Sequence, residues 1–175
     1  MAAAMAGGPP PAHAQGPTLR AGAGRADITP PTGFPMMGWV RSDARATGQH
    51  TRLYARAIVL QQADRKLALV AEDLNGIPGG MLEEAARLVA DRGFSEQNVL
   101  DSASHTHAGP GGFYNFPTYN FLAPTQGTPT DFNLPSPPDR QLYGFEVRQL
   151  AAAIRRADDD LAPAKIGWGR PRSSG

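Results

Sequence analysis

Two histidines separated by one residue, His105 and His107, have the type and spacing needed for metal binding or acid–base chemistry. They follow a short apolar run at residues 98–100, which indicates a buried strand. In an extended segment residues i and i+2 point the same way, so both imidazoles would face one side. Glycine and proline at residues 109–112 then prevent regular structure and let a ligand approach the backbone. Two solvated loop histidines are an equally good interpretation of the spacing alone.

The elements around these histidines predict where a site would form. Residues 66–71 are apolar enough for a central strand, and a helix is expected from Pro78 to about Arg92, ending at Gly93. A second strand follows at residues 98–102. A strand, helix and strand in this order make a crossover, so the two strands should be parallel neighbours. Ligand sites in open α/β sheets form beyond the carboxyl ends of such strands, where the histidines lie.

Two acidic residues, Glu72 and Asp73, mark the carboxyl end of the first of these strands. A carboxylate at this position can bind a metal, accept a hydrogen bond from the second ring nitrogen of a metal-binding histidine, or simply face water. We favour a solvated Glu72. For Asp73 we favour a role near the site, as a possible outer partner of a histidine.

The remaining elements complete an α/β fold. Residues 19–29 should be extended, and residues 48–60 should pair with the 66–71 strand as an antiparallel hairpin. Asp139 is expected to cap a helix that runs to about Asp160, and a last strand is expected at residues 164–168. The predicted fold is therefore a mixed sheet with an antiparallel hairpin and a parallel strand–helix–strand crossover, incomplete at the C-terminus.

A long aromatic loop is predicted at residues 113–138. Phe113 and Tyr114 begin this loop, close in sequence to the histidines. Aromatic residues at this place can line an apolar substrate groove or pack a lid on the core, and we weigh the two equally. The apolar segment at residues 36–39 is more readily core than pocket wall.

The composition excludes several classes of protein. The 175 residues carry a net charge of +1, which gives no reason to expect a nucleic-acid partner. No cysteine is present, so disulfides and thiolate zinc sites are excluded. No apolar run reaches the roughly 18 residues of a membrane span.

Residues 1–17 are rich in Ala, Gly and Pro and are expected to be a disordered tail or the remnant of an export signal. The triplet Ala12-His13-Ala14 fits a signal-peptidase site, although a basic start and an apolar stretch are missing. A secreted or periplasmic protein is expected on this basis, and a cytoplasmic one stays open.

Several segments together resemble the amino-terminal part of the neutral/alkaline ceramidase family of zinc-dependent amidases. They are residues 24–29 (GRADIT), 36–39 (MMGW), 48–57 (GQHTRLYARA), 98–100 (NVL) and 104–112 (SHTHAGPGG). Their order and spacing fit the family, and the resemblance runs from about residue 21 to 169. We therefore expect residues 18–175 to be the amino-terminal portion of a ceramidase-like catalytic domain.

The resemblance implies a zinc ion held by two histidines, a glutamate and a tyrosine, with ceramide as a lipid-like substrate. Only the first ligand maps onto this chain, at His105. His107 matches a histidine of the active-site hydrogen-bond network near the nucleophilic serine, whereas His50 matches a motif position of unassigned role. The other ligands, the serine and an active-site arginine would follow Gly175. Peripheral contact with lipid surfaces is also expected.

Three hypotheses follow. The first is a segment of a zinc amidase of the ceramidase type, hydrolysing N-acylsphingosine to sphingosine and fatty acid. The second is another metal-dependent hydrolase that uses His105, His107, Asp73 and His50 within this chain alone. The third is a non-catalytic fragment or a lipid-binding module.

Overall fold

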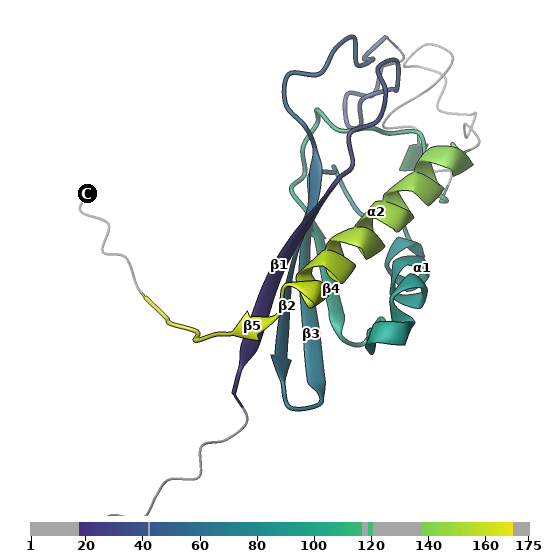
Figure 1. Cartoon of the computed structure of the whole chain (residues 1–175). Coiled ribbons are helices and arrows are strands. Elements are labelled where there is room, and N and C mark those ends of the chain that lie inside the picture. Colours follow the sequence, from purple (N-terminus) through teal and green to yellow (C-terminus); the bar gives the residue numbers. More distant parts are fainter. Residues whose placement is uncertain (1–17, 42, 117–118, 121–137, 170–175) are drawn as a thin grey trace, which may run out of the picture.

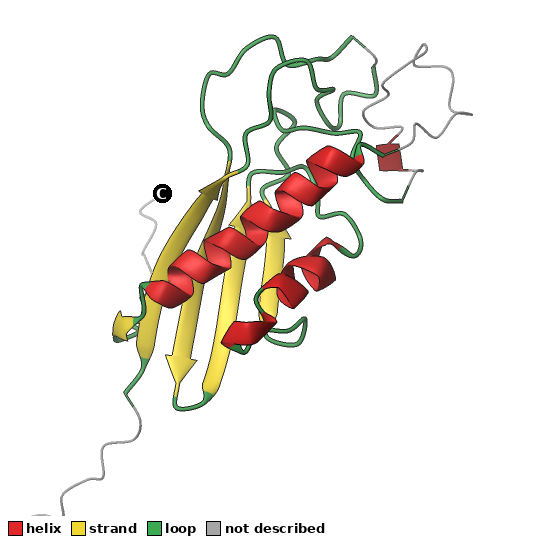
Figure 2. Cartoon of the chain, turned by 45° about the vertical axis from the view of Figure 1, so that its right-hand side comes forward, coloured by secondary structure: helices red, strands yellow, loops and turns green. Residues whose placement is uncertain are grey.

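A computed structural model of the chain describes residues 18–41, 43–116, 119–120 and 138–169. They form a sheet of five strands in the order β4-β3-β2-β1-β5, with helices α1 and α2 on one face (Figures 1 and 2). The α/β class, the antiparallel hairpin and the parallel crossover are thereby confirmed. The predicted tail at residues 1–17 and most of the aromatic loop lie outside the described residues.

Three antiparallel strands make up the first half of the sheet: β1 (Arg20–Asp27), β2 (Tyr54–Gln62) and β3 (Arg65–Glu72). Side chains alternate between buried and exposed along β2 and β3, as expected for a sheet with one covered face. The strand predicted at residues 48–60 begins only at Tyr54, so His50 lies in the loop before it.

The predicted crossover joins β3 to β4 (Val99–Ala103), which lie parallel with Ala68 opposite Val99. Its helix α1 (Met81–Leu88) is shorter than expected and is followed by a 3₁₀ turn, η1 (Ala90–Arg92). The helix begins late because Gly80 has φ of 81°, a left-handed conformation that an α-helix cannot include. Gly93, also left-handed at φ 82°, ends the segment where the sequence predicts.

Helix α2 (Arg140–Asp159) lies across β1 and β2 and buries a mostly apolar face that includes Glu146 (Figure 2). The Asp139 side chain caps it by accepting hydrogen bonds from the amides of Gln141 and Leu142, both at 2.9 Å, as predicted. The helix approaches β1 closely because Gly24 has no side chain: a Cβ there would lie 2.4 Å from the Ala153 carbonyl oxygen.

The strand predicted at residues 164–168 is wrong. The strand in this region is β5 (Ala162–Pro163), which pairs antiparallel with β1 at the edge of the sheet. Pro163 lies opposite Arg20, the first residue of β1, so the chain beyond it runs past the end of its partner strand. A single further hydrogen bond joins the Ala164 amide to the Leu19 carbonyl, at 2.9 Å.

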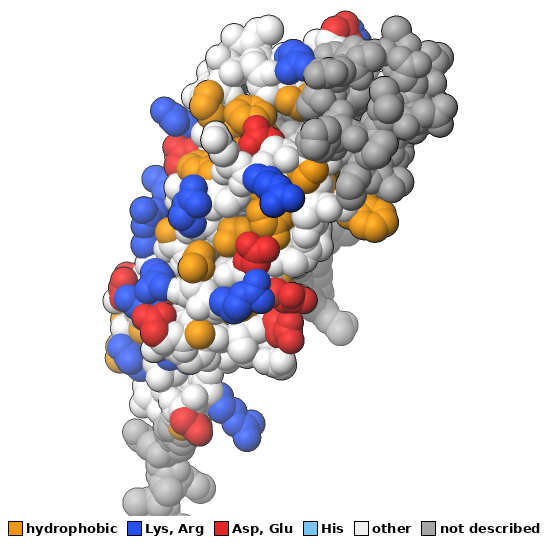
Figure 3. Space-filling model, turned by 90° about the vertical axis from the view of Figure 1, so that its right-hand side faces the viewer, with side chains coloured by type: hydrophobic (Ala, Val, Ile, Leu, Met, Phe, Trp, Pro, Cys, Tyr) orange, Lys and Arg blue, Asp and Glu red, His pale blue; other side chains and the backbone are white. Residues whose placement is uncertain are grey.

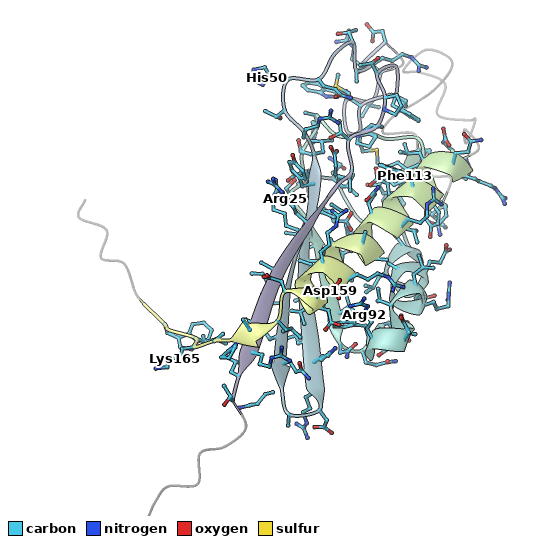
Figure 4. All side chains as sticks on the ribbon, viewed as in Figure 1. Arg25, His50, Arg92, Phe113, Asp159 and Lys165 are labelled. Carbon is cyan, nitrogen blue, oxygen red and sulfur yellow. The ribbon has the colours of Figure 1, made fainter. Side chains whose placement is uncertain are left out.

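Ion pairs hold the far end of α2 to the crossover. Lys66 on β3 contacts Asp158 at 2.6 Å, and Arg92 contacts Asp158 and Asp159. Figure 4 shows Arg92 and Asp159 close together. The outer face of the helices carries scattered charges of both signs (Figure 3), which is typical of a solvated surface.

Candidate functional site

The candidate site lies in the loops beyond the carboxyl ends of β3 and β4, where the sequence places it (Figure 1). The loop after β4 is held to the end of β3 by hydrogen bonds from the Ser104 amide to the Glu72 carbonyl (2.9 Å) and from Thr106 to Leu74 (3.2 Å). The connection between β1 and β2 joins from the other side, with the Met37 amide 3.1 Å from the Gly109 carbonyl. Three connections thus meet around the two histidines.

His105 has a conformation that suits a metal ligand. Its Nδ1 lies 3.1 Å from the carbonyl oxygen of Asn75. A carbonyl can only accept, so in the neutral imidazole this contact requires the proton on Nδ1 and leaves the Nε2 lone pair for a ligand. Its φ of 61° is left-handed, which is uncommon for a residue other than glycine and typical of positions with a function.

His107 lies beside His105, with the ring centroids 5.4 Å apart and the planes at 60°. The segment is not extended, because His105 is left-handed, yet the two imidazoles still come together as predicted. Gly38 packs against the His107 ring: a Cβ at Gly38 would lie 2.7–2.9 Å from three ring atoms. Trp39 donates from Nε1 to the His107 carbonyl at 2.8 Å, and its ring lies edge-on to the imidazole.

Gly38 and Trp39 contact His107, which the hydrophobic pattern of residues 36–39 does not predict. The apolar segment 36–39 suggests core, and Met37 is indeed buried. Trp39 is instead 51% exposed. Nothing in the local sequence signals that this distant segment contacts His107; only the resemblance of residues 36–39 to the family motif points to them.

Asp73 is bound to β2 and not to a histidine. Its carboxylate accepts hydrogen bonds from Arg56 (2.8 Å) and from the Tyr54 amide (2.9 Å). Partial burial alone would raise the pKa of Asp73, but the hydrogen bonds from Arg56 and Tyr54 outweigh it and hold the pKa below its ordinary value. The described contacts therefore give Asp73 the role of fastening β2 to the end of β3.

The solvated position favoured for Glu72 is wrong, because its side chain is fully buried on the helix side of the sheet. Burial, together with the charge of Asp101 on β4, raises the pKa of Glu72 to about 10. Burial also raises the pKa of Asp101 to about 6 and that of Glu146 on α2 to about 8. The sequence misses this cluster because its members come from three separate elements.

Phe113 and Tyr114 pack into the core. Phe113 is fully buried, and Tyr114 is 6% exposed and donates its hydroxyl hydrogen to the Gly76 carbonyl at 2.8 Å. Burial raises the pKa of Tyr114 to about 12. The burial of Phe113 and Tyr114 therefore favours the interpretation that the loop packs on the core over the interpretation that it lines a substrate groove. Phe116 and Tyr119, by contrast, are more than half exposed.

His50 lies at the outer edge of the loops, away from Phe113 (Figure 4). It lines a pocket of about 250 Å³ together with Pro30, Phe34, Leu53 and Pro110. No hydrogen bond or ring contact joins His50 to His105 or to His107 among the described residues. The pocket still borders the site, because Ala108 and Gly109 form part of its wall.

The described residues do not form a complete metal site. Within them, no group of three or more His, Asp or Glu side chains is close enough to hold a metal ion. The second hypothesis, a metal site made of His105, His107, Asp73 and His50, is therefore not supported by these contacts. His105 can supply one nitrogen ligand through Nε2, because its Nδ1 is directed at the Asn75 carbonyl.

Comparison with known proteins gives a consistent result. The sequence profile described as neutral/alkaline non-lysosomal ceramidase, N-terminal, matches residues 19–172. The chain is 40% identical over 165 residues to the neutral ceramidase of Pseudomonas aeruginosa, covering 91% of this chain and 23% of that protein. It is 35% identical over 156 residues to the neutral ceramidase of Mycobacterium tuberculosis, covering 85% of this chain and 23% of the other.

Solved structures agree with the sequence matches. The crystal structure of neutral ceramidase from Pseudomonas aeruginosa superposes with a TM-score of 0.70 at 31% identity, covering 85% of this chain and 23% of that one. A structure titled "Ceramidase complexed with C2" gives 0.68 at 32% identity, covering 84% and 22%. The chain thus spans less than a quarter of the length of these relatives.

Proposed function

The chain belongs to the neutral/alkaline non-lysosomal ceramidase family, and from this premise we propose that it forms part of a zinc-dependent amidase. The reaction proposed is hydrolysis of the amide bond of ceramide to sphingosine and a fatty acid. The conformation of His105 is the observation that carries this proposal, since a carbonyl on Nδ1 leaves Nε2 available to the metal.

His105 would hold the zinc ion together with ligands from other parts of the catalytic domain. When bound, zinc supplies a Lewis acid that polarises an amide carbonyl or activates water. His105 contributes a neutral nitrogen in a fixed orientation, because the Asn75 carbonyl and the left-handed backbone determine where its ring points.

His107 would transfer protons during the reaction. Gly38 lies against its ring and the Trp39 ring packs edge-on to it, so the imidazole is held in place from two directions. A histidine fixed in this way can accept a proton from a nucleophile and return it to the leaving amine. The His107 ring lies next to that of His105, the proposed zinc ligand, with the two ring centroids 5.4 Å apart.

The substrate proposed is a lipid taken from a membrane surface or a micelle. Trp39, Phe116 and Tyr119 are large, exposed aromatic side chains on the loops that follow β1 and β4. Such side chains bind at the boundary between water and lipid. No helix of the described residues is long and apolar enough to cross a membrane. A secreted or periplasmic location, where such lipids are accessible, is part of the same proposal.

The test uses the longest natural form of the protein with a fluorescent ceramide. His105→Ala should lose bound zinc, measured by elemental analysis, together with fatty-acid release. His50→Ala is the matched control for zinc content, because no described contact joins His50 to His105. Full zinc occupancy in the His105→Ala protein would refute the assignment of the ligand.

A further inference from the structure

One face of the sheet has no partner among the described residues. Both helices pack on the same side (Figure 2), so the side chains of alternate strand residues point away from them. On a solvated sheet these outward positions would be mostly polar.

The outward positions near the middle of the sheet are apolar and lie in register. Leu69 on β3 is directly opposite Ile58 on β2 and Leu100 on β4, and Ala23 on β1 is opposite Ile58. Ile58, Leu69 and Leu100 are 50%, 37% and 63% exposed. Two residues further along, Ala21, Leu60 and Leu67 are aligned in the same way. We call these two lines of residues the apolar rows.

The apolar rows end at a polar border. The next outward row toward the candidate site contains Arg25 and Arg56, which are opposite each other and both lie over the Tyr54 ring. On the helix face charged and apolar side chains are interspersed (Figure 3), and Leu88 is its one exposed large aliphatic residue among those described. A contiguous apolar patch bounded by charges is the pattern of a surface that another protein layer covers.

The comparisons indicate what this layer is. The chain covers only 23% of the Pseudomonas relative and 23% of its crystal structure, so most of such a domain is polypeptide other than this segment. The stretch after β5 also lies on the side away from the helices, as Lys165 shows (Figure 4), and adds exposed Ile166 and Trp168. We propose that the apolar rows are the surface on which the remaining part of the ceramidase-type catalytic domain packs. This proposal shares with the proposed function only the assignment of the chain to the ceramidase family.

The absence of cysteine permits a direct test of this surface. Residues 19–172 replace the matching segment of the Pseudomonas enzyme, in which any cysteine is changed to serine. Leu100→Cys reports on the apolar rows, and Leu88→Cys, 43% exposed on α1, is the matched control on the helix face. The rate of thiol labelling under native conditions is compared between the chimera and the 175-residue chain alone.

We expect Leu100→Cys to be labelled rapidly in the chain alone and on the order of 100-fold more slowly in the chimera, where labelling requires local opening. Leu88→Cys should be labelled rapidly in both. Equal rates for Leu100→Cys in the two proteins would overturn the proposal. Protection in the chain alone, with a dimer seen by sedimentation, would also overturn it, because a second copy would then cover the rows.

Two further measurements separate the possible failures. If the chimera does not fold, the Pseudomonas enzyme itself, with cysteine at the position aligned to Leu100, gives the same comparison. Ceramide turnover is measured in parallel. Protection of Leu100→Cys without turnover supports the docking surface and counts against the proposed function.

Discussion

The buried acid Glu72 should make the stability of the folded chain depend on pH. Its side chain is fully buried, and its carboxyl oxygens accept no hydrogen bond from the described residues. Burial and the Asp101 charge raise the pKa of Glu72 from an ordinary 4.5 to about 10. Replacing Glu72 by glutamine removes the titrating group and keeps a neutral donor of almost the same shape.

The sign of the effect follows from proton uptake. In the unfolded chain Glu72 loses its proton near pH 4.5, whereas in the folded chain it keeps it until about pH 10. Between these values folding binds one more proton, so the free energy of unfolding falls by about 1.4 kcal/mol per pH unit. The contribution of Glu72 is complete below pH 4.5 and is lost as the pH rises toward 10.

Glu72 makes the largest contribution to the slope between about pH 8.5 and 9.5. Asp101 and Glu146 have the same sign, but their folded-state pKa values of about 6 and about 8 place their titrations lower. Tyr114 and Tyr143, whose pKa values are raised to about 12, begin to contribute only near the ordinary tyrosine value of 10. Over this one pH unit the wild-type midpoint should fall by about 3–6 °C.

The assay is urea and thermal unfolding of the 175-residue chain at several pH values, followed by circular dichroism. Glu72→Gln should remove most of the slope between about pH 8.5 and 9.5. Glu83→Gln, on the exposed face of α1, is the control and should keep the wild-type slope. An unchanged slope in Glu72→Gln would show that the buried acid does not retain its proton, and would refute the reasoning.

Further predictions concern the site and the packing of the helix. His107→Ala in the longest natural form should keep zinc but lose on the order of 100-fold or more in turnover, because a proton-transfer group is removed; loss of zinc would show that its role is metal binding. Gly38→Ala should lower turnover more than zinc content, since its Cβ would lie 2.7 Å from the His107 ring; an unchanged rate would show that the contact is unimportant. Gly24→Ala should destabilise the chain by about 3 kcal/mol or more, measured by urea unfolding, because the added methyl group would clash with α2 backbone atoms. Residues 18–175 alone should bind less than one zinc per molecule and release no fatty acid, because a catalytic zinc needs about three protein ligands; one bound zinc with turnover would contradict this.

Much of the fold follows from local patterns. The two neighbouring strands expected at residues 48–60 and 66–71 predict the hairpin of β2 and β3, and the order of strand, helix and strand predicts the parallel pairing of β3 with β4. Asp139 identifies the start of α2 by its side-chain chemistry alone. The site is located for the same reason, since the histidines follow a strand whose position the sequence makes clear.

Other features depend on contacts between segments far apart in the chain. The extent of β5 depends on where its partner β1 begins, and the burial of Glu72 depends on Asp101 and α2 arriving on the same face of the sheet. Gly38 reaches His107 only because the β1–β2 connection folds over the loop after β4. Sequence patterns report the period and capping of single elements, because these are local properties of the backbone. The tertiary structure decided the burial of Glu72, the raised pKa values of the buried acids and the orientation of the His105 ring. Each of these depends on the groups that other elements bring within a few ångströms.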